Sequence, residues 1–183
     1  MPRPTPLIRA DQIHRRVVAL GRRIGDELAE RELIVVPLLG GAFCFVADLV
    51  RQIHHPGLRL HFAAASSYHG GRSSSGQVTV RDLPPTADKD FLVVDDILDT
   101  GRTLQAVTGA LVAGGAASVR SCVLLDKPAR RAVPIRADYV GFTIPDRFVV
   151  GYGLDHEDRW RHLPDVCVLD QGGPSPPSHG LRA

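Results

Sequence analysis

The chain has 183 residues, which is enough for one domain with a buried core. Its hydrophobic fraction of 44% and charged fraction of 23% are ordinary for a globular protein, and its net charge of +2 is too small to predict binding to nucleic acid or to a membrane. No apolar run approaches the ~20 residues that a transmembrane helix needs. The N-terminal segment lacks the apolar core of a signal peptide. The three cysteines have no metal-like spacing and predict reduced thiols in a cytoplasmic protein.

Strand-like and helix-like patterns alternate along the chain, which predicts a mostly parallel sheet flanked by helices. Apolar side chains recur at helical spacing in residues 11–30 and 42–54, and Asp11 could cap the first helix. A third helix is expected at 104–113. Continuous or alternating apolar patterns predict strands at 33–38, 58–66, 77–81, 91–94, 118–125, 139–143, 148–150 and 166–169.

Two stretches have the composition of irregular structure. Residues 68–76 are rich in Gly, Ser and His and predict a flexible loop. Residues 171–183 are rich in Gly, Pro and Ser and predict a disordered tail. The sequence contains no internal repeat and no sign of a second domain, so we expect one domain.

The segment from Phe91 to Thr103 carries the most information. Residues 91–94 predict a central strand covered on both faces, and Asp95 and Asp96 follow this strand directly. In an open α/β sheet, ligands bind at the carboxyl ends of the strands. The turn at residues 99–101 then opens a helix, whose first backbone N–H groups would form a cradle for a phosphate. This pattern predicts an anion site.

Simpler interpretations of these polar groups stay open at this stage. Asp99 or Thr100 could serve only as the N-cap of the helix, and the adjacent acids could be a solvated strand end. Gly40-Gly41 could bind a second anion through exposed N–H groups, or it could be an ordinary strand-to-helix turn.

Five stretches occur in the order found in type I phosphoribosyltransferases. Residues 91–103 resemble the family's phosphoribosyl-pyrophosphate (PRPP) signature, and residues 37–41 resemble its pyrophosphate loop. Residues 66–68 resemble the start of its mobile lid, and residues 124–128 resemble the stretch that carries a purine-reading lysine. Residues 140–155 resemble the purine-binding hood of the hypoxanthine-guanine enzymes, particularly the bacterial hypoxanthine enzymes.

This resemblance implies a fold and a domain organisation. The fold would be α/β, with a mostly parallel central sheet flanked by helices. A small hood subdomain would be formed by the N-terminal segment and about residues 127–169, within a single domain at 7–170.

The resemblance also implies a donor site for PRPP. Its signature residues are Asp95, Asp96, Ile97, Leu98, Asp99, Thr100, Gly101, Arg102 and Thr103. Pyrophosphate would be bound by Leu39, Gly40, Gly41, Ser67, Tyr68 and Arg161. Magnesium is the implied cofactor, with Asp95, Asp96 and Asp155 as its protein ligands. The family has a cis peptide bond that carries over to the bond between Leu38 and Leu39, and Leu39 stands where relatives often have a basic residue.

The implied purine site consists of Lys127, Phe148, Val149 and Asp155. Lys127 would donate to the exocyclic oxygen of a 6-oxopurine, Phe148 would stack on the ring, and Val149 would offer backbone groups. Without the resemblance, Lys127 is better explained as a solvated loop lysine, Phe148 as a core residue and Arg161 as part of a helical surface run. Asp99 would be the general acid/base that handles a proton near N7 of the purine.

The expected function is therefore purine salvage. The enzyme would transfer phosphoribose from PRPP to hypoxanthine, and also to guanine, in the cytoplasm as a homo-oligomer, either a dimer or a tetramer. A xanthine or pyrimidine phosphoribosyltransferase remains an alternative. An RNA-binding regulator built on the same fold is a third possibility, which the small net charge and the dispersed arginines disfavour.

Overall fold

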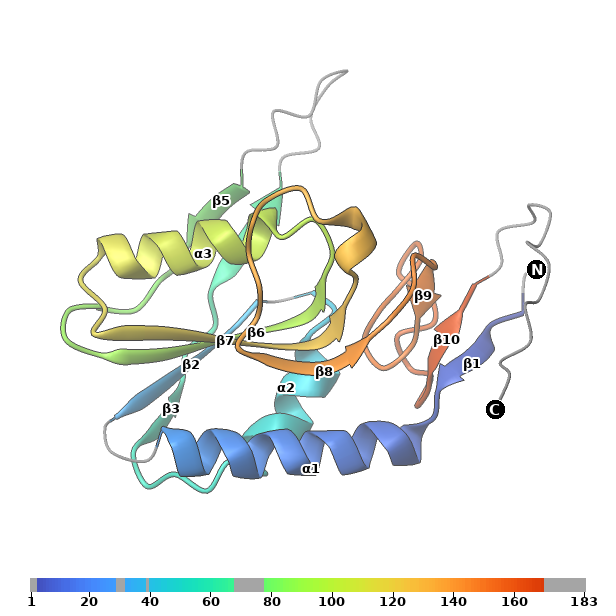
Figure 1. The fold of residues 1–183 in the computed structure, drawn as a ribbon, viewed down its shortest axis with the longest axis horizontal. Coiled ribbons are helices and arrows are strands. Elements are labelled where there is room, and N and C mark those ends of the chain that lie inside the picture. Colours follow the sequence, from blue (N-terminus) through green and yellow to red (C-terminus); the bar gives the residue numbers. More distant parts are fainter. Residues whose placement is uncertain (1–2, 29–31, 39, 68–77, 170–183) are drawn as a thin grey trace, which may run out of the picture.

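A parallel sheet of five strands forms the centre of the molecule, in the order β3-β2-β6-β7-β8 (Figure 1). The computed structural model describes residues 3–28, 32–38, 40–67 and 78–169. The strands of this sheet are β2 (Leu33–Pro37), β3 (Leu58–Leu60), β6 (Asp90–Leu98), β7 (Ser118–Asp126) and β8 (Tyr139–Thr143). The fold class expected from the alternating pattern is confirmed.

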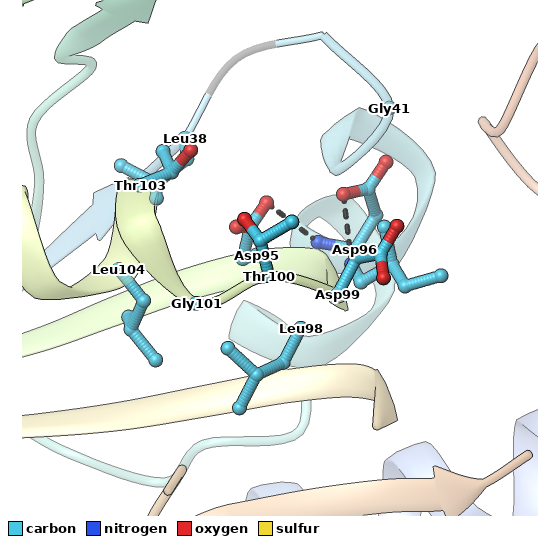
Figure 2. A pocket seen from close by; sticks show the side chains of 11 residues that line it. Leu38, Gly41, Asp95, Asp96, Leu98, Asp99, Thr100, Gly101, Thr103 and Leu104 are labelled. Atoms are coloured by element: carbon cyan, nitrogen blue, oxygen red, sulfur yellow. Dashed lines mark hydrogen bonds between the residues drawn. The ribbon is translucent and has the colours of Figure 1, made fainter. Parts of the chain in front are cut away.

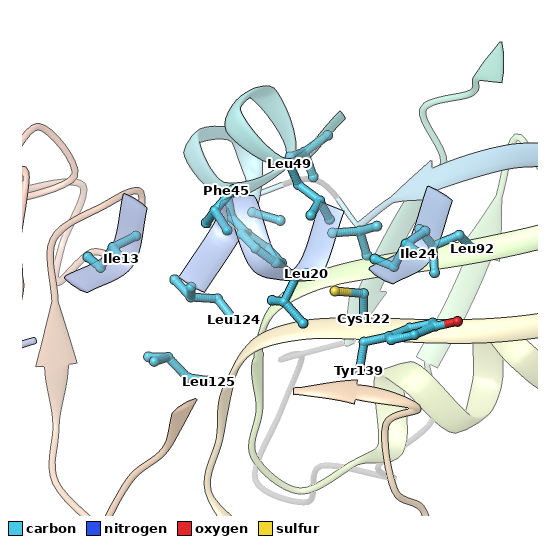
Figure 3. Packing of buried hydrophobic residues seen from close by; sticks show 14 of the residues in the cluster. Ile13, Leu20, Ile24, Phe45, Leu49, Leu92, Cys122, Leu124, Leu125 and Tyr139 are labelled. Atoms are coloured by element: carbon cyan, nitrogen blue, oxygen red, sulfur yellow. The ribbon is translucent and has the colours of Figure 1, made fainter. Parts of the chain in front are cut away.

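Helices cover both faces of the sheet. In Figure 1, α3 (Arg102–Ala113) lies on one face, and α1 (Ala10–Glu27) and α2 (Phe43–Val50) lie on the other. Alternate residues of β6 serve the two layers: Leu92 and Val94 pack in the α1–α2 layer shown in Figure 3, whereas Phe91 and Val93 pack against α3. All four side chains are fully buried. The run of consecutive apolar residues therefore reflects a strand with two buried faces.

A second, antiparallel sheet lies beyond β8 in Figure 1. It has the order β1-β10-β9 and consists of β1 (Thr5–Ile8), β10 (Val166–Val168) and β9 (Val149–Val150). Thr5 pairs with Val168, so the N-terminal segment meets the last described strand. This pairing is compatible with the expected hood, whose boundaries stay a prediction.

The predicted single strand at 58–66 is wrong, because the chain changes partners within it. β3 pairs with β2, and Ala63 forms an isolated parallel bridge with Leu38. The chain then enters β4 (Ala64–Ser67), which pairs antiparallel with β5 (Val78–Arg81). The expected loop at 68–76 and the expected tail at 171–183 lie outside the described residues.

The start of α1 also differs from the sequence prediction. Its N-cap is Arg9 rather than Asp11. The Arg9 N–H donates to Gln12 Oε1 at 2.9 Å, and Asp11 instead forms an ion pair with Arg15 at 2.8 Å within the first turns. A second boundary also moves, because α2 spans eight residues and ends before the predicted limit of 54.

The cysteines are free thiols, with Cys122 and Cys167 buried and Cys44 half-buried. Burial raises the pKa of the Cys122 thiol, which keeps it protonated and unreactive. None of the described helices is long and apolar enough to span a lipid bilayer.

Helix α3 has one buried and one exposed valine, and replacing each of them tests how much the packing of α3 against the sheet stabilises the fold. Val107 is fully buried against the sheet, whereas Val112 is 62% exposed on the same helix. We predict that Val107→Ala lowers the free energy of unfolding by about 2 kcal/mol, from lost apolar burial and a residual cavity. Val112→Ala should change it by less than about 0.5 kcal/mol. Urea denaturation measures both values, and equal losses would contradict the packing described here.

Candidate active site

A cavity of about 280 Å³ opens where β6 ends, between the turn that leads into α3 and the loop that follows β2 (Figure 2). The residues that line it come mainly from the sequence signature. They are Leu38, Gly41, Asp95, Asp96, Ile97, Leu98, Asp99, Thr100, Gly101, Thr103 and Leu104. The position at the carboxyl end of a central parallel strand agrees with the site expected from the sequence.

The two adjacent acids lie inside β6, which runs on to Leu98, and not beyond the strand end. Asp95 Oδ1 accepts a hydrogen bond from the Asp96 N–H at 3.0 Å, and Asp96 Oδ1 accepts one from the Ile97 N–H at 2.8 Å. Burial raises the pKa of Asp95 well above its usual range, and the neighbouring Asp96 carboxyl adds to this rise. Burial also raises the pKa of Asp96, although hydrogen bonds and the charge of Arg161 oppose the rise. The pair would therefore be stabilised in its charged form by a cation.

The turn after β6 has a glycine in a left-handed conformation at the start of α3. Helix α3 begins at Arg102, and its N-cap is Gly101, which has a φ of 85°. The simpler interpretation of Asp99 or Thr100 as the N-cap is therefore wrong. The first bond at this end runs from the Gln105 N–H to the Gly101 carbonyl at 2.9 Å. The N–H groups of residues 102–104 have no partner within the helix, and the Arg102 N–H makes only a long hydrogen bond of 3.5 Å to Thr100 Oγ1, so this end of the helix could meet an anion.

Asp99 has an unsatisfied carboxylate. Its Oδ1 atom is buried and accepts no hydrogen bond from the residues that the structure describes. The Arg130 Nε atom is 3.6 Å away, close enough for charge attraction but too far for a hydrogen bond. Buried polar atoms normally have a partner, so this oxygen is suited to interact with a ligand.

A segment from the other side of the site supports this turn. The Lys127 N–H donates to the Leu98 carbonyl at 3.0 Å, and the Ala132 N–H donates to the Thr100 carbonyl at 2.9 Å. Arg131 forms an ion pair with Asp126 at the end of β7. Residues 127–132 therefore fix the position of the turn. The sequence analysis missed the roles of Arg130 and Arg131, because two arginines after a proline indicate only a charged surface turn.

The loop after β2 also approaches the acids closely. A Cβ atom on Gly41 would lie 1.6 Å from Asp96 Oδ2, so any larger residue would displace the Asp96 carboxylate. A Cβ atom on Gly153 would lie 2.1 Å from the Gly41 carbonyl oxygen, which places the segment after β9 against the same loop. Both interpretations of Gly40-Gly41, an anion-binding loop or an ordinary turn, therefore stay open. Leu39, its peptide bond with Leu38, and Tyr68 lie outside the described residues.

The expected helix-like surface run around Arg161 is wrong, because residues 157–160 include three with positive φ. Arg161 instead folds back over its own loop. It pairs with Asp155 at 2.9 Å and donates to the Gly153 carbonyl at 2.9 Å. Asp155 also accepts from the Asp158 N–H at 2.9 Å. Ser67 is described only through its backbone, which pairs with Val78 in the β4–β5 hairpin.

Of the residues expected to bind a purine, Lys127 lies next to this site, because its N–H donates to the carbonyl of the lining residue Leu98. Lys127 is 4% exposed, so the alternative of a solvated loop lysine is wrong. Its ammonium pairs with Asp146 at 3.1 Å, a contact that the sequence analysis did not foresee. Phe148 is 41% exposed, so the core alternative is also wrong, and its ring meets His156 edge-on at 5.2 Å. Val149 is buried and pairs with Val168.

Comparison with known proteins identifies relatives of this arrangement. The family model for the phosphoribosyl transferase domain matches residues 9–157. Hypoxanthine phosphoribosyltransferase of Salmonella typhimurium is 43% identical, over 87% of this chain and 93% of the relative. Hypoxanthine-guanine phosphoribosyltransferase of Staphylococcus epidermidis is also 43% identical, over 82% of this chain and 84% of the relative.

A solved structure gives the same result. Hypoxanthine phosphoribosyltransferase from Staphylococcus aureus superposes with a TM-score of 0.84 at 39% identity, and the match covers 90% of each chain. The bifunctional protein TilS/HprT of Listeria monocytogenes is 42% identical over 89% of this chain. The matched part of the chain spans only 25% of the length of that relative.

The left-handed N-cap of α3 generates a testable prediction. In Gly101→Ala, the new Cβ would lie 2.6 Å from Ile135 Cγ2 at a φ of 85°. We predict a loss of about 1–3 kcal/mol of folding free energy from backbone strain and overlap. Gly109→Ala is the matched control, because nothing lies within 4 Å of a Cβ at that position of the same helix. It should stabilise the protein by about 0.5–1 kcal/mol. Thermal unfolding of the two variants should shift in opposite directions.

Proposed function

The chain belongs to the phosphoribosyl transferase domain family, and from this membership we propose that it is a purine salvage enzyme. It transfers phosphoribose from PRPP to hypoxanthine, and also to guanine, and it releases pyrophosphate and the nucleoside monophosphate. One observation carries the proposal: the hydrogen bond of 3.0 Å from the Lys127 N–H to the Leu98 carbonyl joins the base-reading lysine to the anion-binding turn. A base held at Lys127 therefore lies beside a sugar phosphate held at the turn.

In this proposal, the donor lies along the cavity with its 5-phosphate at the start of α3. The N–H groups of residues 102–104 and the hydroxyls of Thr100 and Thr103 bind that phosphate, and the carboxylates of Asp95 and Asp96 hold the ribose diol. The pyrophosphate extends toward the loop that follows β2. Its proposed contacts are Leu39, Gly40, Gly41, Ser67, Tyr68 and Arg161.

Magnesium fits the chemistry of this site. Asp95 and Asp96 are neighbouring carboxyls whose burial raises the pKa of each, so a cation would favour their charged form. Magnesium prefers one or two carboxylates together with substrate oxygens and retained waters. We assign Asp95 and Asp96 to the diol side and Asp155 to the pyrophosphate side. When bound, the metal neutralises charge on the leaving pyrophosphate.

The purine binds between Lys127, Phe148 and Val149, with Asp155 at its edge. The lysine ammonium only donates hydrogen bonds, so it favours the exocyclic oxygen of hypoxanthine or guanine over the amino group of adenine. The exposed ring of Phe148 offers a flat apolar face for stacking. The backbone of Val149 offers hydrogen-bonding groups to the edge of the base.

Asp99 handles the proton in this mechanism. The purine N9 forms a bond to the ribose C1 as the bond from C1 to the pyrophosphate oxygen breaks, and the sugar develops oxocarbenium character. The purine must lose a proton in this step. The carboxylate of Asp99, whose Oδ1 has no hydrogen-bond partner among the described residues, can accept that proton near N7.

The cellular setting is also a proposal. We propose a cytoplasmic enzyme without a nucleic-acid partner, and the small net charge of +2 supports the second part of this proposal. We propose a homo-oligomer, either a dimer or a tetramer, and sedimentation equilibrium of the purified chain would decide between them.

A substrate panel tests the proposed reaction. Purified protein with magnesium and labelled PRPP is offered hypoxanthine, guanine, xanthine, adenine or uracil in turn. Inosine monophosphate should form from hypoxanthine at the highest kcat/KM, with guanine next. Turnover of xanthine or uracil alone would reassign the base, and no turnover with any base would overturn the function.

The proton role of Asp99 gives a sharper prediction. Asp99→Asn should lower kcat by at least about a hundredfold, because the amide cannot accept the proton. The Kd for PRPP should stay within about threefold, since the N–H cradle is unchanged. Asp88→Asn, at an exposed acid in the turn before β6, is the control and should retain wild-type kcat. Equal losses in kcat and donor binding would instead indicate that Asp99 only supports the turn.

A further inference from the structure

Asp146 forms an ion pair with the lysine that is proposed to read the base. Its Oδ1 atom lies 3.1 Å from Lys127 Nζ, and the side chains of Lys127 and Asp146 are 5% and 55% exposed, respectively. Of the two partners, therefore, only the lysine is removed from water. A buried ammonium is costly unless a carboxylate or other acceptor compensates it. In the described part of the chain, Asp146 is the carboxylate that does so.

The backbone holds Asp146 in place from both sides. The Ile144 N–H donates to the Asp126 carbonyl at 2.9 Å, and Asp126 directly precedes Lys127. The Leu169 N–H donates to the Phe148 carbonyl at 3.0 Å. Asp146 lies midway between these two anchored residues. These bonds hold the backbone on both sides of Asp146, and its carboxylate lies 3.1 Å from the Lys127 ammonium.

The pair has two chemical consequences for a bound base. A lysine ammonium has three N–H donors, so the contact with Asp146 leaves donors that can point at an oxygen of the base. The carboxylate accepts hydrogen bonds only, so on its own it would welcome the amino group of adenine. Pairing with Lys127 engages one of its oxygens, Oδ1, and places a positive charge beside the carboxylate. The ion pair therefore leaves donors for the oxo group and places a cation where an amino group would otherwise meet a free carboxylate.

We propose that Asp146 is a positioning residue that sets the selectivity for a 6-oxo group over a 6-amino group, by holding the ammonium of Lys127 toward the base. The inference rests on the proposed function, which it deepens by naming a second residue that controls base choice. With the Lys127 ammonium in place, Asp146 acts through the lysine and does not contact the base itself.

A purely structural role for the pair predicts something different. Ion pairs with a well-exposed partner usually contribute little to stability. If Asp146 only stabilised the loop, its loss would affect the base and the donor alike, because the Lys127 backbone also holds the donor turn through Leu98. A change confined to the base therefore separates positioning from structural support.

Asp146→Asn removes the charge with little change in shape. We expect the KM for hypoxanthine to rise about tenfold, which corresponds to about 1.4 kcal/mol of binding free energy. The KM for PRPP should stay within about twofold, and Asp146→Glu should recover part of the loss. Asp11→Asn is the matched control, because it removes a carboxylate from an exposed ion pair far from the site in sequence. Thermal unfolding of each variant confirms that the protein folds.

A double-mutant cycle tests whether the Asp146 carboxylate accepts a hydrogen bond from an amino group of the base when the Lys127 ammonium is removed. Lys127→Met keeps the apolar stem of the side chain but removes the ammonium, so the carboxylate of Asp146 becomes available. Adenine use relative to hypoxanthine should rise about tenfold in this variant. The double variant Lys127→Met with Asp146→Asn should lose most of that gain, because the amide is a weaker acceptor.

The outcomes separate this inference from the function on which it rests. Wild-type protein that turns over no oxopurine would overturn the proposed function. Wild-type turnover of hypoxanthine, together with an unchanged KM for hypoxanthine in Asp146→Asn, would overturn the inference alone. An equal rise in both KM values, or equal adenine use in the single and double Lys127 variants, would overturn it as well.

Discussion

The backbone hydrogen bond from the Lys127 N–H to the Leu98 carbonyl is the contact on which the site depends. It joins the end of the central strand β6 to the segment that follows the neighbouring strand β7. Because both strands are parallel members of one sheet, their carboxyl ends already meet at the same edge. The bond holds the backbone of the buried lysine next to the end of β6, directly before the turn that is proposed to bind the donor phosphate. Reaction between a base and a sugar phosphate needs this kind of fixed separation, since the gain from proximity is lost when groups are misplaced.

The same edge of the sheet concentrates features that would be unfavourable elsewhere. Asp95 and Asp96 are neighbouring buried carboxyls, and burial raises the pKa of both. Asp99 keeps an oxygen without a hydrogen bond among the described residues, and Gly101 adopts a left-handed conformation. The buried carboxyls and the oxygen without a partner oppose folding, but they suit a ligand that brings hydroxyl groups, phosphates or a metal ion. Gly101 allows the left-handed turn without strain and leaves room for such a ligand. Local departures from favourable folding chemistry are expected where a protein has a function.

The sequence predicted the framework because the framework follows from apolar pattern. The run at 91–94 has no polar alternation, and it proved to be the central strand with helices on both faces. Contacts that depend on the folded chain could not be read in this way. Residues 58–66 are all compatible with one strand, and only tertiary pairing divides them between β3 and β4. Likewise, nothing in the sequence places Asp146 at Lys127 or Arg131 at Asp126, because ion-pair partners are chosen by the fold. The functional roles of the signature residues stay predictions that the experiments address.

The segment from β8 to the loop after β9 supplies the carboxylates of two charge pairs, and we place these pairs at opposite ends of the proposed substrate. Asp146 meets Lys127 at the proposed base end, whereas Asp155 meets Arg161 next to Gly153 and the loop of Gly41 at the proposed pyrophosphate end. In each pair the carboxylate holds a cation that a ligand oxygen can also approach. One segment therefore supplies the carboxylate that pairs with Lys127 at the proposed base end, and the Asp155–Arg161 pair at the proposed leaving-group end. A shift of this segment would disturb both ends together, whereas loss of a single carboxylate would disturb only the end that it serves.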